Sequence, residues 1–332
     1  MIKNFSKLLP YLIWTGGILL TASCVKETAD DEPRLEEQRY FELYMASHYP
    51  DAVPEASGLY YIVNKEGAGE IPGDSTWVLL DYVSYILPDE DVYDTYIENV
   101  AIDNNLYDTA ALYGPYKLKN GLLNDGFTEG LSMMKEGGEA TFLFTSDLGY
   151  GSSKTGSVGA YHSLKYEVRL VKVLGDNIES YEATHILAYA DTIPDADTIY
   201  DVETDSYMYY VVDSATTGAP VAIDSTIQVA YKGYLLDGRV FDETKDDNYY
   251  EFKVGDYESG TSPIVGWHLG LQRFREGEKG RLIIPYQLAY GEFGKHTTRG
   301  NVAIPPYESL VFDVEVVSVT AGEDDTHPVT EK

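Results

Sequence analysis

The sequence predicts an α+β protein made of two tandem copies of one module, each an antiparallel sheet wrapped on a short helix. Three observations predict it. Gly126–Gly151 (GFTEGLSMMKEGGEATFLFTSDLGYG) aligns without gaps with Gly266–Gly291 (GWHLGLQRFREGEKGRLIIPYQLAYG) at an offset of 140 residues. In the second copy, short apolar, β-branched runs surround one helix-like segment. Finally, 30 Tyr, 30 Gly and 14 Pro in 332 residues favour turn-rich β structure over a helical bundle.

The repeat extends to both sides of this segment. Three further pairs match: Ser163–Val173 with Ser309–Val319, Gly58–Val63 with Tyr207–Val212, and the helix-like lead-ins Glu37–Tyr44 with Glu182–Tyr189. A period of ~140–150 residues is far longer than that of a solenoid repeat, so the pattern indicates a duplicated domain. The predicted divisions are a signal peptide (1–23), an acidic tether with a short helix (24–56), the first domain (57–175), a linker with a short helix (176–206), the second domain (207–320) and a disordered tail (321–332).

The elements of the second copy follow from hydrophobic pattern. Ile227–Leu236 alternates as a strand does and ends at an Asp-Gly turn. Gly266–Glu276 is predicted to be a short helix, because Trp267 and Leu271 fall on one side of it. Two further strands are predicted at Gly280–Pro285 and Leu310–Val319, which are apolar and rich in β-branched residues.

Composition excludes several classes of function. A formal net charge of -31 argues against binding nucleic acid or anionic lipid headgroups by electrostatics, because both partners need a basic face. Hydrophobic residues at 44% and aromatic residues at 13% exclude a disordered acidic chain. The single cysteine excludes a disulfide framework and a cysteine-based zinc site. His268 and His296 have no second ligand at metal-binding spacing, so we expect both to be surface residues and expect no metal or cofactor.

The N-terminus predicts export. Lys3 and Lys7 precede Leu8–Leu20, an apolar stretch of 13 residues that is shorter than a membrane span of ~20. Thr21-Ala22-Ser23-Cys24 resembles a bacterial lipobox, which implies lipidation of Cys24; the alternative is an ordinary secretory signal. Cleavage before Cys24 would leave 309 residues and a charge of -33. The acidic segment Val25–Pro33 is predicted to be a solvated tether. It also resembles the export signal of surface lipoproteins in the Bacteroidetes.

Five strings in the second copy carry a family resemblance. They are Val229-Ala230-Tyr231-Lys232-Gly233, Asp237-Gly238-Arg239-Val240-Phe241-Asp242, Ile264-Val265-Gly266-Trp267, Leu288-Ala289-Tyr290-Gly291, and Ile304-Pro305-Pro306 with Leu310-Val311-Phe312-Asp313-Val314. In order, spacing and residue type they resemble the FKBP family of peptidyl-prolyl isomerases. The resemblance implies a curved antiparallel sheet around a short helix, with an apolar prolyl pocket between them.

The same resemblance assigns roles within the pocket. Trp267 would form the floor under the proline ring, while the Tyr290 hydroxyl and the Ile264 backbone N–H would hold flanking carbonyls. The implied catalytic residues are Asp242, Tyr290, Trp267, Tyr231 and Phe312, and the implied substrate-binding residues are Phe241, Tyr250, Phe252, Ile264 and Ile304. Any one of these aromatic residues could instead belong to an ordinary core. Three departures from the family pattern alter the pocket rim: Pro263, the insertion Tyr257–Ser262 and the long loop Gly294–Val302.

The first copy is expected to be degenerate. It keeps equivalents of several pocket residues, namely Tyr82, Tyr93, Asp94, Tyr150 and Tyr166. Phe127 replaces the tryptophan floor, Asn124 replaces Ile264, Val158–His162 replaces the Ile-Pro-Pro loop, and Ile97–Leu112 is a long insertion. A lost indole and a polar Asn should weaken proline binding by a few kcal/mol, at ~25 cal/mol per Å² of apolar contact.

The sequence therefore predicts a lipid-anchored prolyl isomerase (rotamase) of the cell envelope. Its expected partners are proline-containing, unfolded or partly folded exported proteins and, through the N-terminal lipid, the outer membrane on its periplasmic or surface face. The alternative is a non-catalytic peptide-binding or chaperone lipoprotein of the same fold. A glycan-binding or glycan-cleaving lipoprotein is a third class, but no paired carboxylates of a sugar cleft support it.

Overall fold

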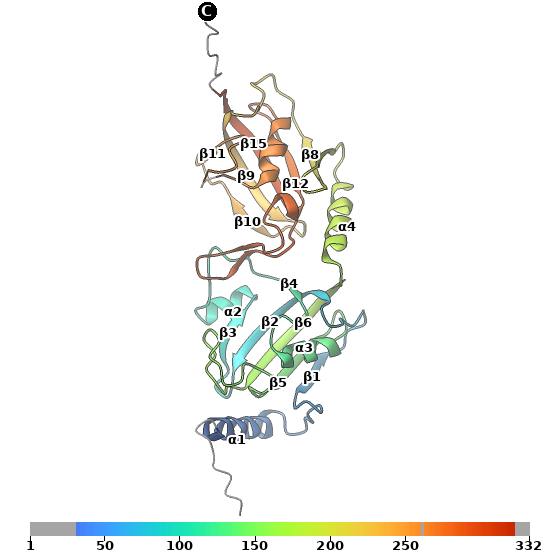
Figure 1. Ribbon diagram of the computed structural model, residues 1–332, viewed down its shortest axis with the longest axis vertical. Coiled ribbons are helices and arrows are strands. Elements are labelled where there is room, and N and C mark those ends of the chain that lie inside the picture. Colours follow the sequence, from blue (N-terminus) through green and yellow to red (C-terminus); the bar gives the residue numbers. More distant parts are fainter. Residues whose placement is uncertain (1–30, 260–261, 323–332) are drawn as a thin grey trace, which may run out of the picture.

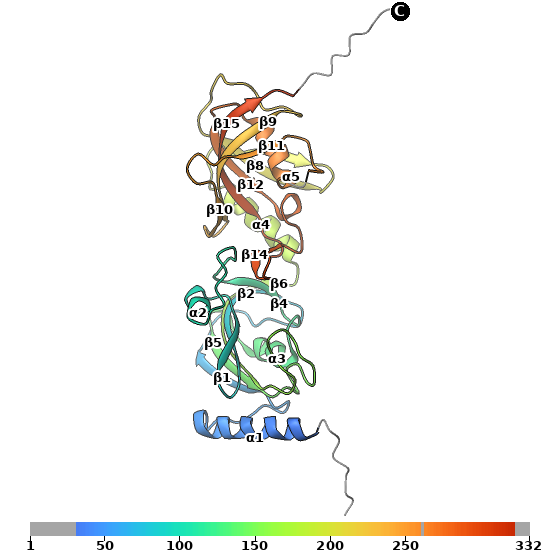
Figure 2. The same cartoon turned by 90° about the vertical axis from the view of Figure 1, so that its left-hand side faces the viewer.

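Two modules follow each other along the long axis of the molecule, and a separate helix leads into each of them (Figure 1). The computed structural model describes residues 31–259 and 262–322. Each module is a curved antiparallel sheet packed on one short helix (Figure 2). The α+β class and the duplication that the sequence predicted are therefore confirmed.

The first module has a six-stranded sheet. Its strand order is β1-β5-β6-β2-β3, with β4 also paired to β2. Helix α3 packs on the concave face, and α2 belongs to the insertion that follows β3. The elements are β1 (Tyr60–Lys65), β2 (Trp77–Ile86), β3 (Asp91–Thr95), α2 (Glu98–Asp103), β4 (Tyr116–Lys119), α3 (Asp125–Met133), β5 (Glu139–Phe144) and β6 (Leu164–Gly175).

The second module repeats this topology. Its sheet has the strand order β10-β9-β15-β12-β8-β7, with β11 also paired to β9. The order β10-β9-β15-β12-β8 corresponds, strand by strand, to β3-β2-β6-β5-β1 of the first module. The elements are β7 (Asp197–Asp201), β8 (Ser206–Val212), β9 (Thr226–Leu235), β10 (Val240–Glu243), β11 (Tyr250–Lys253), α5 (Val265–Gly270), η1 (Leu271–Arg273), β12 (Lys279–Ile284), η2 (Tyr286–Leu288), β13 (Lys295–His296), β14 (Val302–Ile304) and β15 (Leu310–Thr320).

The three predicted strands are present as β9, β12 and β15. The predicted helix is shorter than expected: α5 ends at Gly270, one 3₁₀ turn follows, and Phe274 has an extended backbone. The helical segment stops before Phe274. The extended backbone of Phe274 directs its side chain into the core, where it is buried. Strand β7, within the predicted linker, was not foreseen because only Ile199 of its five residues is buried.

Each short helix lies unusually close to its sheet. A Cβ on Gly266 would lie 2.4 Å from Cγ2 of Ile284, and one on Gly126 would lie 2.5 Å from the ring of Phe144. These two glycines occupy equivalent positions of the repeat. Only glycine permits this approach, which places the next residue, Trp267 or Phe127, against the centre of the sheet.

The two lead-in helices also repeat each other. In α1 (Asp31–His48), the buried Glu37 carboxylate accepts hydrogen bonds from the Ser146 backbone N–H at 2.6 Å and the Ser163 hydroxyl at 2.8 Å. In α4 (Ile178–Ala190), the buried Glu182 accepts one from the Ser309 hydroxyl at 3.2 Å. The shared spacing of the lead-ins thus corresponds to a shared contact with the following module.

Several predictions at the chain ends lie outside the described residues. These are the signal peptide, Cys24 and nearly all of the disordered tail. Helix α1 begins at Asp31, inside the stretch expected to be a tether, and Pro33 sits in its first turn, where proline is tolerated. Within residues 31–259 and 262–322, no helix is both long and apolar enough to cross a bilayer.

The modules meet at a buried ionic cluster. Nζ of Lys117, on β4, lies 2.6 Å from Glu182 Oε1 and 2.8 Å from Glu308 Oε2, and the three side chains are 7%, 1% and 8% exposed. Beside the cluster, Trp77 packs edge-on against Tyr307 with 5.3 Å between ring centroids. Because one ammonium faces two buried carboxylates, the site carries excess negative charge, and burial raises the pKa of Glu308 to about 7.

We expect Glu308→Gln to remove a pH-dependent loss of stability. The folded-state pKa of Glu308, about 7, lies above its ordinary value of 4.5. The stability that the protonated Glu308 side chain contributes is therefore complete below pH 4.5, and it is lost as the pH rises through about 7. The melting temperature of the variant, relative to wild type, should therefore rise between pH 5 and pH 8 in calorimetry. Glu179→Gln, an exposed carboxylate on the same helix as Glu182, controls for the lost charge. A difference that stays constant across this range would contradict the assignment.

Candidate functional site

In the second module Trp267 is surrounded by aromatic side chains, and we call this aromatic box the Trp267 pocket. The Trp267 side chain is 3% exposed and lies in α5, directly after the close contact made by Gly266. The rings of Tyr231 and Phe312 stand at 83° and 88° to the indole, with centroid distances of 4.9 and 5.2 Å. Tyr250 approaches in the same way at 5.7 Å and 86°. These edge-to-face contacts fix the rings as walls around the indole.

The structure brings together all ten side chains that the sequence analysis placed in the pocket. Nine belong to the apolar core of the second module or pack against it, and the tenth, the exposed Asp242, accepts a 2.7 Å hydrogen bond from the Tyr231 hydroxyl. The nine are Tyr231, Phe241, Tyr250, Phe252, Ile264, Trp267, Tyr290, Ile304 and Phe312.

The sheet register explains how two of the walls come close. On neighbouring strands β9 and β15, Gly233 lies opposite Phe312. A Cβ on Gly233 would lie 2.7 Å from the Phe241 ring and 2.8 Å from the Phe312 ring, so both phenyl groups occupy the space that a side chain would need. The sequence analysis did not assign this role to Gly233. A glycine inside an alternating strand is the signal that could have found it.

Three donors border the aromatic box. Trp267 Nε1 is buried and has no acceptor within the described residues, although buried donors are nearly always paired in folded proteins. Ile264 and Tyr290 are half-buried, and they contribute a backbone N–H and a hydroxyl. An aromatic box bordered by donors is suited to an apolar ring flanked by carbonyl oxygens.

The expectation for one of the two histidines was wrong. His268 is fully buried, because the segment before α5 folds over it: the Gly255 N–H donates to Nδ1 at 3.0 Å, and Ser262 Oγ lies 2.9 Å from Nε2. This burial lowers the pKa of His268. His296 is exposed, as expected.

The equivalent place in the first module is filled by its own hydroxyl groups. The Tyr93 and Tyr166 hydroxyls lie 2.5 Å apart, Asn124 Nδ2 donates to Tyr166 at 2.9 Å, and the Tyr150 hydroxyl joins the same network. Burial raises the pKa of Tyr93 and of Tyr166, which keeps both hydroxyls neutral. In the second module, Phe241 and Phe312 stand where Tyr93 and Tyr166 do, and because they lack hydroxyls they cannot pair with the Tyr290 hydroxyl.

Asn124 has two roles in this network. Its Oδ1 accepts a hydrogen bond from the Phe127 backbone N–H at 3.0 Å and so caps α3, while its amide nitrogen donates to the Tyr166 hydroxyl.

The half-buried Asp94 accepts a 2.5 Å hydrogen bond from the Tyr82 hydroxyl, and burial raises the pKa of Asp94. The first module therefore presents paired polar groups where the second presents an apolar pocket.

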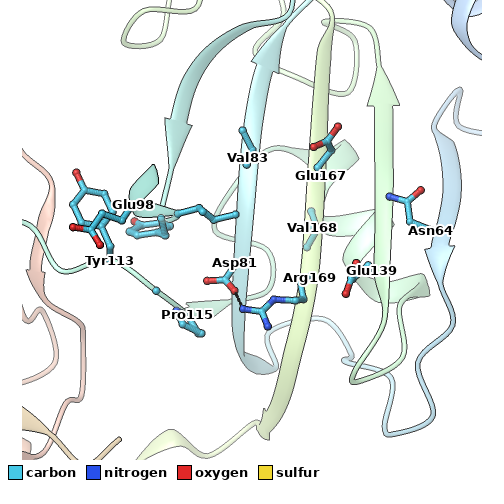
Figure 3. Close-up of a pocket in the computed structure, with 13 residues that line it drawn as sticks. Asn64, Asp81, Val83, Glu98, Tyr113, Pro115, Glu139, Glu167, Val168 and Arg169 are labelled. Carbon is cyan, nitrogen blue, oxygen red and sulfur yellow. Dashed lines mark hydrogen bonds and ion pairs between the residues drawn. The ribbon is translucent and has the colours of Figure 1, made fainter. Parts of the chain in front are cut away.

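A second cleft, of about 540 Å³, lies on the outer face of the first sheet (Figure 3). Asp81 on β2 and Arg169 on β6 form an ion pair in it, and Glu139 and Glu167 lie at its edge. Tyr113 and Pro115, from the end of the insertion, form the facing wall. This cleft holds an ion pair and further carboxylates and has no tryptophan in its lining, so the Trp267 pocket remains the candidate site.

Comparison with known proteins agrees with this geometry. A sequence model of the family described as FKBP-type peptidyl-prolyl cis-trans isomerase matches residues 69–171 and 218–317, one segment in each module. The chain is 42% identical over 102 residues to the macrophage infectivity potentiator of Trypanosoma cruzi, covering 30% of this chain and 46% of that protein. It is 35% identical over 117 residues to a probable FKBP-type peptidyl-prolyl cis-trans isomerase of Haemophilus influenzae, covering 35% and 44%.

Among solved structures, the crystal structure of FkpA from Escherichia coli is 30% identical and covers 43% of this chain and 59% of that chain, with a TM-score of 0.34. The chain spans less than half the length of the two relatives named above.

We expect Tyr166→Phe to destabilise the first module. Removing this hydroxyl leaves Asn124 Nδ2 and the Tyr93 hydroxyl without their partner in a buried place, which costs about 1–3 kcal/mol. The change can be measured by native-state hydrogen exchange of β5 and β6 amides. Tyr85→Phe is the matched control, because its hydroxyl binds the 44% exposed Glu167, where water can replace it. Equal costs for the two variants would show that the network contributes no stability.

Proposed function

The chain belongs to the FKBP-type peptidyl-prolyl cis-trans isomerase family, and on that premise we propose that its second module isomerises Xaa-Pro peptide bonds in the Trp267 pocket. The observation that carries the proposal is the box of aromatic rings around a buried indole whose Nε1 has no acceptor within the described residues. Proline-containing polypeptides are the substrate class that this family implies.

The chemistry needs exclusion of water more than reactive groups. An Xaa-Pro amide rotates over a barrier of ~18–20 kcal/mol, because its C–N bond has partial double-bond character. Water stabilises the charge-separated planar amide more than the twisted transition state. An apolar pocket that removes this water therefore lowers the barrier, because the planar ground state loses more stabilisation by water than the twisted transition state does.

The side chains of the pocket have distinct tasks in this mechanism. The proline ring lies on Trp267 between Tyr231 and Phe312. The Tyr290 hydroxyl and the Ile264 N–H donate to the carbonyls that flank the proline and so hold the substrate chain. Asp242, kept in position by the Tyr231 hydroxyl, is the polar group that we assign to interact with the rotating amide.

We propose that the first module does not isomerise prolines. Tyr93, Tyr150, Tyr166 and Asn124 satisfy one another in the place of the pocket, so a proline ring would have to break their hydrogen bonds to enter. This network supports the non-catalytic alternative for the first module alone.

For the whole chain, we propose an envelope protein anchored through diacylated Cys24 that assists the folding of exported proteins. The supporting features are the lysines and apolar stretch before the single cysteine, and a net charge of -31 that keeps an aromatic-rich protein away from anionic surfaces. Slow prolyl isomerisation, over tens to hundreds of seconds, gives such an enzyme a task.

Activity should depend on the second pocket alone. In the soluble chain from residue 25 onward, we expect Trp267→Ala and Asp242→Val each to lower kcat/KM on a prolyl tetrapeptide by at least ~10-fold, which corresponds to ~1.4 kcal/mol of lost transition-state stabilisation. The measurement is an NMR exchange or protease-coupled assay. Asp94→Val, the equivalent change in the first module, should leave the rate unchanged.

Two outcomes would contradict this proposal. A wild-type rate no higher than the uncatalysed one would favour the non-catalytic binding protein. A rate that falls with Asp94→Val as much as with Asp242→Val would place activity in both modules. Near-ultraviolet circular dichroism of each variant separates these outcomes from loss of folding.

Anchoring is tested independently of activity. We expect Cys24→Ser to abolish incorporation of radiolabelled palmitate and to release the protein from the membrane fraction. Protease shaving of intact cells then distinguishes the surface face from the periplasmic face. Retention of label and of membrane association by the variant would show that the sequence around Cys24 is not a lipobox.

A further inference from the structure

Two loops form the rim of the Trp267 pocket on the side that faces the first module. One is the turn between β9 and β10, which ends at Arg239 and leads to Phe241 and Asp242. The other is the rim hairpin, residues 295–304, formed by β13, β14 and their connection. Strand β14 carries Ile304, and the hairpin pairs only with itself, apart from the seven-stranded sheet. Two-stranded hairpins of this kind are marginally stable without further contacts.

The tip of the rim hairpin is held by the first module. Asp108 Oδ2 accepts hydrogen bonds from the Thr297 hydroxyl at 2.7 Å and from Asn301 Nδ2 at 3.1 Å. Arg299 Nη1 donates to the Tyr107 carbonyl at 3.1 Å. Asp108 is only 7% exposed, and its other oxygen, Oδ1, accepts a hydrogen bond from the Ala110 backbone N–H at 3.0 Å, so the carboxylate is held by contacts in both modules.

The same stretch of the first module also reaches the second rim loop. The Leu112 backbone N–H donates to the Val302 carbonyl at 2.8 Å, and Arg239 Nη1 donates to the Tyr113 carbonyl at 3.3 Å. The Leu112 side chain, 9% exposed, belongs to the apolar core of the second module, the core that also contains Ile304 and Phe312. Residues 107–114, which we call the clamp segment, thus contact both rim loops.

The contact also lies beside residues of the first module's filled pocket. A cavity of about 370 Å³ lies between the modules and is lined by Tyr93 and Asp94 on one side and by Arg299, Gly300 and Asn301 on the other. Strand β14 lies at this boundary in the view of Figure 2. The hairpin tip therefore shares a cavity with Tyr93 and Asp94 of the first module.

We propose that the clamp segment of the first module positions the rim of the second module's prolyl pocket, with Asp108 and Leu112 as positioning residues. This inference rests on the proposed isomerase function of that pocket. Asp108 fixes the tip of the hairpin whose base carries Ile304, and Leu112 fills the core behind the rim. The first module then contributes to catalysis through structure, without a prolyl pocket of its own.

The test uses the soluble two-module chain and compares two aspartates of the same insertion. Asp108→Ala removes the acceptor for Thr297 and Asn301, whereas Asp103→Ala removes an exposed carboxylate on α2. For Asp108→Ala we expect roughly a tenfold rise in KM for a prolyl peptide with a smaller change in kcat. Asp103→Ala should match wild type. Asp108→Asn, which keeps one acceptor oxygen, should fall between.

Hydrogen exchange provides a readout that does not depend on activity. In Asp108→Ala, the amides of residues 295–304 should exchange faster, while those of β15 and of the first module's sheet stay as in wild type. Leu112→Ala is the second variant and should loosen the same hairpin. Unchanged KM and unchanged hairpin exchange in both variants would overturn the inference.

The two proposals fail in different ways. The wild-type chain could be inactive while Asp108→Ala still speeds hydrogen exchange in the rim hairpin. This outcome would refute the isomerase function. It would also refute positioning for catalysis, because the clamp segment would then be a structural contact only. If the wild-type chain is active and neither Asp108→Ala nor Leu112→Ala changes kcat or KM, only the proposed role of the clamp segment is refuted.

Discussion

The close packing of each short helix on its sheet is the constraint on which the pocket depends. Gly266 and Gly126 let the helix backbone approach to a distance that no Cβ would permit, and the next residue is thereby driven against the centre of the curved sheet. In the second module this residue is Trp267, and three rings from three different strands stand edge-on to it. The backbone fixes where this residue lies, and its side chain decides whether the module presents an indole or a phenyl ring there.

The two modules show how one fold can keep or lose a pocket through a few oxygen atoms. Phe241 and Phe312 offer the Tyr290 hydroxyl no partner, and it has no hydrogen bond to the part of the chain that the structure describes, whereas Tyr93 and Tyr166 pair with each other and with Asn124. The buried hydroxyls stabilise the first module because they satisfy one another. The same pairing removes the unmet hydrogen-bonding capacity that a substrate would use, so fold alone does not decide activity.

The junction between the modules is more than a linker. Lys117 bridges the lead-in helix and the second module inside a buried cluster, and the clamp segment contacts both rim loops. An acidic chain would be expected to repel itself at such a contact. Here the excess carboxylate is accommodated by a raised pKa at Glu308 and by the few cations, Lys117, Arg239 and Arg299, that the chain places at the boundary.

The sequence by itself determined the α+β class, the duplication and which side chains gather around Trp267, because repeat offset, strand alternation and ordered motifs are local in the chain. It also determined that the first copy differs, since Asn124 and Phe127 are visible substitutions. Only the tertiary structure decided that the insertion at Ile97–Leu112 contacts the rim of the other module, that His268 is buried, and that Gly233 makes room for two phenyl rings. Those features depend on pairs of residues far apart in the chain, and a single sequence carries no signal of which distant segments will meet.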